Sequence, residues 1–218
     1  LPRYVVLVPG TWINDVAATW RMAELTGSPL MVAAVQSAAL LPMALLAVVA
    51  GTLADIVDRR KILIATQLFM MVVAGGLTLL AYLDLLGPIS LLALTFALGC
   101  GAAMALPAQA AITPELVPPQ QLASAVALHS VGINVARSIG PAVGGLVVAQ
   151  LGVAWAFGLN AVSFLGVALV LGWWKRAPDA GNLPPEGFGM ALRAGLRYAR
   201  HAAAFRAVLA KAGSFFVF

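Results

Sequence analysis

The stretch from residue 51 to residue 63, GTLADIVDRRKIL, is a polar break between two long apolar segments. The segments run from Leu30 to Ala54 and from Ile62 to Leu83. Each is long enough to cross a bilayer core of roughly 30 Å as a helix. Three consecutive basic residues, Arg59 to Lys61, lie in the break, and such clusters mark loops that stay in the cytoplasm. The stretch therefore predicts a helical hairpin in a membrane, with its loop on the cytoplasmic side.

The composition of the whole chain agrees with that prediction. Its 218 residues are 62% hydrophobic and only 10% charged, whereas about a quarter of the residues in soluble domains are charged. Because a soluble domain of this size needs more polar cover, the composition excludes an ordinary soluble enzyme, a disordered chain and a fibrous repeat. The single cysteine, Cys100, excludes a disulfide framework and a multi-cysteine metal site. We expect neither a metal nor another cofactor.

Six segments have the length and apolar character of membrane spans, which predicts an all-α membrane protein. They are Tyr4 to Leu25, Leu30 to Ala54, Ile62 to Leu83, Ile89 to Ala111, Leu122 to Leu151 and Trp155 to Trp174. Residues 1–174 would form one six-helix bundle. Residues 175–206 read as a cytoplasmic linker with a basic amphipathic helix on the membrane surface, and residues 207–218 as the truncated start of a seventh span.

Lys and Arg are distributed unevenly between the two ends of the predicted spans. They cluster at residues 59–61 and after residue 174, whereas the three short loops at the other end contain none. The positive-inside rule therefore places the N-terminus in the cytoplasm of a multi-pass protein of the plasma membrane, which is the inner membrane in a bacterium. The net charge of +5 reflects this asymmetry and an attraction to anionic membrane lipid, so nucleic acid is not an expected partner.

Within the loop, Gly51 and Asp55 predict specific contacts. A glycine at the end of a span lets another backbone approach closely. Asp55 lies just past the expected end of its helix, where the helix dipole disfavours a carboxylate. We therefore expect Arg59, Arg60 or the N-terminus of another helix to stabilise it. A plain surface ion pair in a positive-inside loop is the alternative interpretation.

The same loop resembles the motif G-x-L-a-D-R-x-G-R-K of the major facilitator superfamily, which lies between spans two and three. The matching residues are Gly51, Leu53, Ala54, Asp55, Arg59 and Arg60, while Ile56 and Asp58 replace the usual Arg and Gly. Residues 107–118 and 134–145 are similar to drug and siderophore exporters of that superfamily. The resemblance implies the N-terminal six-helix bundle of a twelve-helix fold, with the missing C-terminal six-helix half as its partner.

Small residues recur at every fourth position of the fifth predicted span, at Gly132, Ala136, Gly140 and Gly144. Such a stripe allows tight contact with another helix, and a proline in the same span can bend it. The motif Gly140, Pro141, Gly144 and Gly145 is similar to the antiporter motif of exporters in the superfamily. A plain packing face explains the same residues.

Two ionisable residues fall near the middle of predicted spans, Asp15 in the first and Arg137 in the fifth. An Arg in the hydrocarbon core costs about 3 kcal/mol or more unless it meets a partner or water. We expect Asp15 and Arg137 to face one central cavity and to be coupled, directly or through water. Alternatively, each is a structural residue satisfied by backbone or water. Asn14, Gln36 and Asn134 are further candidates for lining this substrate and proton cavity.

These features favour a secondary active transporter and not an enzyme. It would export a small amphipathic molecule, a drug or a siderophore, by alternating access between two bundles. Residues 95–101 lack the Arg of the superfamily's span-four motif, so coupling to protons would depend on Asp15. An importer of the same superfamily remains open. An intramembrane enzyme is disfavoured because Ser163 has no nucleophile context, and a channel because no filter segment is visible.

Overall fold

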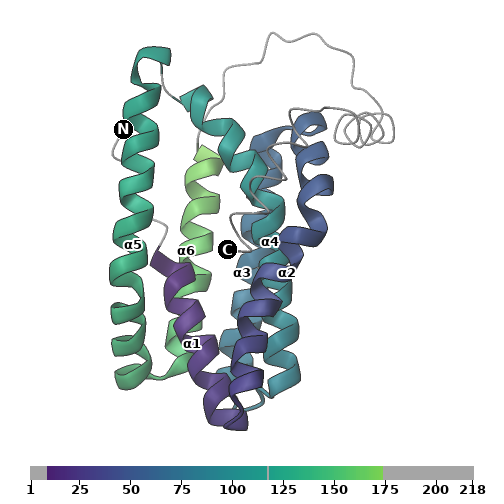
Figure 1. Cartoon of the computed structure of the whole chain (residues 1–218), viewed down its shortest axis with the longest axis vertical. Helices are drawn as coiled ribbons and strands as arrows, with labels where there is room; N and C mark the ends of the chain where they lie inside the picture. Colours follow the sequence, from purple (N-terminus) through teal and green to yellow (C-terminus); the bar gives the residue numbers. More distant parts are fainter. Residues whose placement is uncertain (1–8, 117, 174–218) are drawn as a thin grey trace, which may run out of the picture.

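The computed structural model describes residues 9–116 and 118–173, which form an all-α bundle (Figure 1). Its elements are α1 (Pro9–Thr26), α2 (Pro29–Ile56), α3 (Arg59–Tyr82), α4 (Pro88–Leu116), the 3-10 helix η1 (Pro119–Gln121), α5 (Leu122–Leu151) and α6 (Val153–Trp173). The predicted fold class is confirmed, and the fifth predicted span coincides with α5. The first five residues of the first predicted span, the linker and the seventh span lie outside the described residues.

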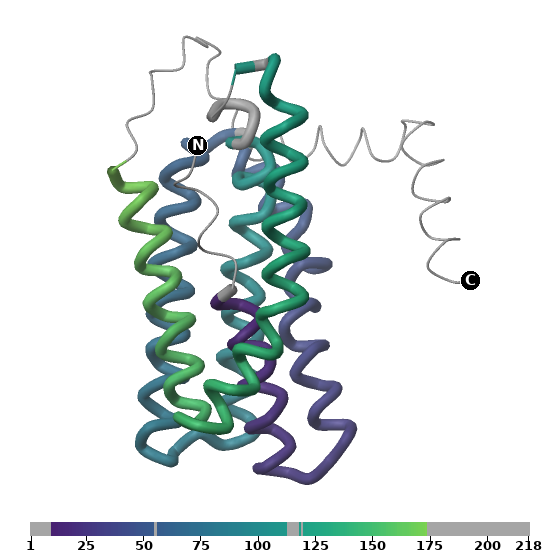
Figure 2. Tube along the Cα trace, turned by 90° about the vertical axis from the view of Figure 1, so that its left-hand side faces the viewer, coloured from purple at the N-terminus to yellow at the C-terminus, as the bar shows by residue number. Residues whose placement is uncertain are grey.

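The long helices run alongside one another, with their connections gathered at two ends (Figures 1 and 2). We call the end with the α2–α3 connection the upper end, as drawn in Figure 1, and the other the lower end. At the lower end, the turns contain Gly27, Asp84 and Gly152, whose φ angles are 60°, 54° and 89°. This left-handed region suits glycine and tolerates Asp, which explains the sharp reversals there.

Helix α1 packs against four other helices of the bundle. It contacts α2, α4, α5 and α6. Ala17, Ala18 and Met22 of α1 are only 0%, 1% and 0% exposed, and they belong to the main apolar core together with Leu77 of α3 and Phe157 of α6. One face of α1 is therefore part of the core, whereas Trp20 and Glu24 of α1 are exposed.

Five helices, α2 to α6, are long and apolar enough to cross a membrane by length and composition. The predicted first span, Tyr4 to Leu25, extends beyond the described residues and stays a prediction, but the described part of α1 does not meet that criterion by itself. The physical reason is its polar content: Asn14, Asp15, Arg21 and Glu24 all fall within its 18 residues. Its place inside the bundle reduces the contact that these side chains make with lipid.

Prolines do not interrupt the helices in which they lie. α2 continues through Pro42 and α5 through Pro141. The buried ring of Pro42 packs where α4 passes α2, and a Cβ added at Gly99 of α4 would lie 3.0 Å from its Cγ and would also meet the carbonyl oxygen of Ala39. The absence of a side chain at Gly99 therefore allows the close α2–α4 contact. This contact lies within residues 95–101, the stretch that lacks the span-four Arg.

Candidate functional site

The small-residue stripe of α5 packs directly against α1. Gly140 and Gly144 are both buried on α5. A Cβ added at Gly140 would lie 2.6 Å from the Cβ of Trp12, and one added at Gly144 would lie 3.1 Å from the Cα of Ile13. The first distance is too short for a Cβ unless the helices shift, and the second is tighter than most side-chain contacts, so glycine at both positions favours this close approach of α1 and α5. A Cβ at Gly145 meets no described atom within 4 Å, so the motif's last glycine makes no such contact.

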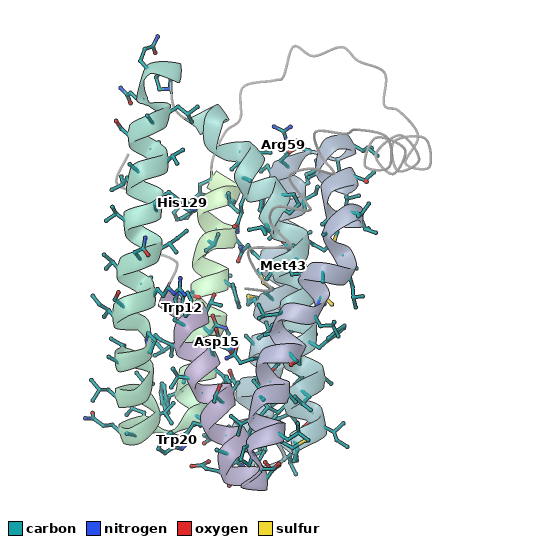
Figure 3. All side chains as sticks on the ribbon, viewed as in Figure 1. Trp12, Asp15, Trp20, Met43, Arg59 and His129 are labelled. Carbon is teal, nitrogen blue, oxygen red and sulfur yellow. The ribbon has the colours of Figure 1, made fainter. Side chains whose placement is uncertain are left out.

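The close approach brings Trp12 of α1 beneath a charged side chain of α5. The guanidinium carbon of Arg137 lies over the indole of Trp12, 5.9 Å from the ring centroid. This is the geometry of a cation–π interaction. Arg137 is exposed and lies at the midpoint of α5, while Trp12 is half-buried. Figure 3 shows Trp12 where α1 passes α5, with Asp15 about one turn further along α1.

Asp15 is part-buried, and its backbone carbonyl accepts a 2.7 Å hydrogen bond from the Thr19 hydroxyl of the same helix. Asn14 is only 3% exposed, and its Oδ1 has no hydrogen-bond partner among the residues that the structure describes. An orphaned buried amide oxygen of this kind favours a nearby water molecule.

Asp15 and Arg137 do not form a salt bridge. The ion pairs found within the described ranges involve Arg21 with Glu24 and with Asp84. Arg137 instead lies over Trp12, which precedes Asp15 by three residues on α1. The structure thus brings the two predicted charges to the same α1–α5 junction, with an aromatic ring as the residue that Arg137 contacts. Coupling through water stays a prediction.

The other predicted cavity residues differ in their surroundings. Asn134 is exposed on α5, where its amide donates a 2.8 Å hydrogen bond to the carbonyl of Ser130 and its own carbonyl accepts one of 2.9 Å from Ser138. Both bonds lie within α5, and the second is accepted by the backbone carbonyl of Asn134. Gln36 is exposed on α2. Among the described residues, neither side chain is hydrogen-bonded to Trp12 or Arg137, so the site is centred on α1 and α5.

The motif loop joins four helices at the upper end. Nε of Arg60 donates a 2.8 Å hydrogen bond to the carbonyl of Leu171 in α6, and its Nη2 donates one of 2.6 Å to the carbonyl of Gly172. Nη1 of Arg59 donates a 3.3 Å hydrogen bond to the carbonyl of Ala111 in α4. Leu53 of α2 packs beside Leu171 against the apolar cluster at this end. The loop therefore connects α2, α3, α4 and α6.

Two expectations about this loop are corrected by the structure. α2 extends through Ile56, since the amide of Val57 donates a 2.9 Å hydrogen bond to the carbonyl of Leu53. Asp55 therefore lies inside the last turn and not beyond it, and its side chain is outside what the structure describes. A Cβ added at Gly51 meets nothing within 4 Å in the described part of the chain, so no backbone approaches it there.

Asp58, which stands where the superfamily motif has Gly, has a local role that we did not predict. It is the N-cap of α3, and its carboxylate accepts a 2.9 Å hydrogen bond from the backbone amide of Arg60. An Asp directly before a helix is a standard start signal, so the sequence carried the information. The cap fixes the first turn of α3, from which Arg60 reaches α6.

A polar network at the lower end also escaped prediction. Arg21 of α1 pairs with Glu24 and with Asp84 of the α3–α4 turn, each at 3.4 Å. The indole nitrogen of Trp20 donates a 2.7 Å hydrogen bond to Glu24. The spacing of Arg21 and Glu24 along α1 was visible in the sequence. We did not single out Arg21 because it lies inside a helix, and the orientation argument counts Lys and Arg only in loops.

The packed helices, their apolar lengths and the motif loop define the class of protein: a multi-pass membrane protein with the N-terminal bundle of a major facilitator fold. A family model described as "transmembrane secretion effector" matches residues 5–218, and the chain belongs to this family of the major facilitator superfamily. The resemblance drawn from the motifs is thereby confirmed.

Three relatives place the chain within the superfamily. The staphyloferrin A transporter of Staphylococcus aureus is 32% identical over 168 residues, which cover 76% of this chain and 42% of that protein. An MFS-type transporter of Bacillus subtilis is 29% identical over 180 residues, covering 81% and 42%. Macrolide efflux protein A of Streptococcus pyogenes is 29% identical over 134 residues, covering 62% and 33%. The chain therefore spans less than half the length of these relatives.

Proposed function

We propose that the full-length protein is a secondary active transporter that exports small amphipathic molecules from the cytoplasm by alternating access. The observation that carries this proposal is the charged and aromatic group at mid-bundle, where Arg137 of α5 lies over Trp12 of α1 and Asp15 follows about one turn later. Exposing an Arg to lipid at that depth is costly, so Arg137 faces a wet cavity or the second bundle. The names of two relatives, a siderophore transporter and a macrolide efflux protein, support small-molecule export.

The bundle acts as one of two halves in this proposal. α2 and α5 carry many exposed large apolar side chains, among them Leu45 at 62% and Leu146 at 61%. Lipid and a C-terminal six-helix half would cover these faces, and the substrate would bind between the halves. Rocking of one half against the other then exposes the site to each side of the membrane in turn. No covalent chemistry is required, so we propose that the protein is not an enzyme.

Coupling to protons is assigned to Asp15. It is the carboxylate of α1 that lies beside Trp12, whereas Glu24 is held by Trp20 and Arg21 at the lower end. A carboxylate next to the substrate path can bind a proton in one state of the cycle and release it in the other. The basic residues Arg59 to Lys61 support the proposal that the upper end faces the cytoplasm and that the protein lies in the plasma membrane.

The test is transport by the full-length protein in cells. Efflux of a macrolide and of staphyloferrin A, the compounds named for the relatives, would be followed with and without a proton uncoupler. We expect outward transport of at least one compound, abolished by the uncoupler and by Asp15→Asn. Gly76→Ala is the matched control, since a Cβ there meets nothing within 4 Å of the described chain. Efflux that persists with the uncoupler contradicts proton coupling, and the absence of any directional transport contradicts the proposal.

A further inference from the structure

Among the described residues, Arg137 leaves its hydrogen-bonding capacity unused. Within the described residues, its guanidinium donates no hydrogen bond and lies in no salt bridge, and its one recorded interaction is with the Trp12 ring. The side chains of Ser130, Asn134 and Ser138 on α5 each donate a hydrogen bond to their own helix backbone, and none of the hydrogen bonds of the described residues joins them to Arg137. The N–H donors of Arg137 are therefore available to a molecule that enters from outside the bundle.

The contact with Trp12 leaves those donors accessible while it holds the side chain. A guanidinium is planar, and its five N–H groups lie in that plane as a fork that matches a carboxylate or a phosphate. A ring on one side of the guanidinium restricts its position without consuming an N–H donor. Trp12 packs directly against α5 at Gly140. A Cβ at that position would lie 2.6 Å from the Trp12 Cβ, so glycine leaves the space that Trp12 occupies. The donor group is thus positioned before any ligand arrives.

The depth of the group determines what kind of ligand fits. Arg137 lies at the midpoint of α5, away from the lipid headgroups at either end. In a setting of low polarity, a charge-assisted and bidentate contact is stronger than a neutral one. The apolar ring beside the charge favours a ligand with an aromatic or aliphatic part next to its acidic group.

We propose that Arg137 and Trp12 form the recognition site for a carboxylate on the transported molecule. Arg137 binds the carboxylate, and Trp12 positions the guanidinium and contacts the adjoining apolar part of the substrate. This inference rests on the proposed function and narrows its substrate class to organic acids with an apolar portion. Asp15 lies about one turn from Trp12. When Asp15 is ionised, its carboxylate repels an anionic substrate, so removal of the Asp15 charge strengthens substrate binding.

The test compares two dyes that share a xanthene ring system and differ in charge. Carboxyfluorescein is anionic and rhodamine 6G is cationic, and their binding to the purified full-length protein would be followed by fluorescence anisotropy in phosphatidylcholine nanodiscs. Arg137→Gln is expected to weaken carboxyfluorescein binding by about tenfold or more, the loss typical of a hydrogen bond to a charged group. Rhodamine 6G binding is expected to stay the same or to strengthen.

Variants of Trp12 separate its positioning role from simple packing. Trp12→Phe retains an aromatic face and should stay within about twofold of the wild type, whereas Trp12→Leu should weaken carboxyfluorescein binding by several fold, as the loss of a cation–π contact implies. Arg137→Lys keeps the charge without the fork and should lie between the wild type and Arg137→Gln. It also serves as the second variant if Arg137→Gln does not fold, as judged by size-exclusion chromatography.

Three results would overturn the inference. One is wild-type protein that does not bind carboxyfluorescein, and another is Arg137→Gln protein that binds it as tightly as the wild type does. The third is an equal loss of both dyes in folded Arg137→Lys protein, which would show a structural role. Arg137-dependent binding without efflux in cells would support the inference and contradict the proposed function, so the two failures can be told apart.

Discussion

Arg60, in the first turn of α3, donates a 2.8 Å hydrogen bond from Nε to the backbone carbonyl of Leu171 in the last turn of α6. A second hydrogen bond, of 2.6 Å, runs from its Nη2 to the carbonyl of Gly172. The last carbonyls of a helix have no partner within that helix, and the end of the helix carries a partial negative charge. A cationic residue of the motif loop therefore caps α6 from a different helix. This contact gives Arg60 a structural role inside the bundle.

Arg60→Gln should destabilise the full-length protein by about 1–3 kcal/mol, because it removes the charge and at least one of two charge-assisted hydrogen bonds. The measurement is the apparent melting temperature in detergent. Lys61→Gln is the matched control, since it removes the same charge from an exposed neighbour with no such contact recorded. Equal melting temperatures for the two variants would show that general loop charge, and not the α6 cap, is responsible.

Gly140→Ala should lower stability through the α1–α5 contact. The new Cβ would lie 2.6 Å from the Cβ of Trp12, so the two helices must separate. Overpacking of this kind costs about 1–3 kcal/mol. Gly145→Ala, where a Cβ meets no described atom, is the control and should melt close to the wild type. If both variants melt alike, the close approach is not a constraint in the full-length protein.

Exchanging the charges of Asp15 and Arg137 should not rescue transport. Each single variant, Asp15→Arg or Arg137→Asp, is expected to reduce uncoupler-sensitive efflux by tenfold or more, on the order of the penalty for a misplaced intramembrane charge. Because the two side chains form no salt bridge and Arg137 contacts Trp12, the double exchange does not recreate a native pair. Efflux by the double variant well above that of both single variants would demonstrate a direct pair in another state of the cycle.

At Asp84, the positive φ angle should matter more for stability than the ion pair with Arg21. Exposed salt bridges contribute about 0.2–1 kcal/mol, so Asp84→Asn should have a small effect on stability. Asn also tolerates the φ angle of 54° at this position. Asp84→Ala lacks that tolerance and should be less stable than Asp84→Asn by about 1 kcal/mol. Unfolding curves in denaturant measure both differences, and equal curves would assign the effect to the lost charge with Arg21.

The approximate places of the helices were predictable, and their exact ends less so. The length of the apolar segment predicted both ends of α5 correctly, because the residues that flank α5 are polar or turn-forming. The end of α2 was misjudged by two residues, since Asp55 looks like a loop residue although a backbone hydrogen bond at Val57 continues the helix. The first span is harder to recognise from apolar length, because α1 carries Asn14, Asp15, Arg21 and Glu24.

The candidate site was half predictable. An Arg or Asp in the middle of a span is functional by default, so the sequence alone pointed to Arg137 and Asp15. Trp12 was not singled out, because a lone Trp in an apolar segment has no distinguishing pattern. Its importance follows from the position of Gly140, which lies on another helix and more than a hundred residues later in the chain.

The sequence by itself determined the membrane environment, the all-α class and the motif loop. These follow from composition, apolar length and short spacings, which are local properties of the chain. The tertiary structure decided which residues meet: Trp12 with Arg137, Arg60 with the end of α6, and Arg21 with Asp84. Such pairs depend on the rotation and spacing of whole helices, which are set by the packing of many small contacts, including the glycines of α5. For that reason, the charges could be located from the sequence, but their partners could not.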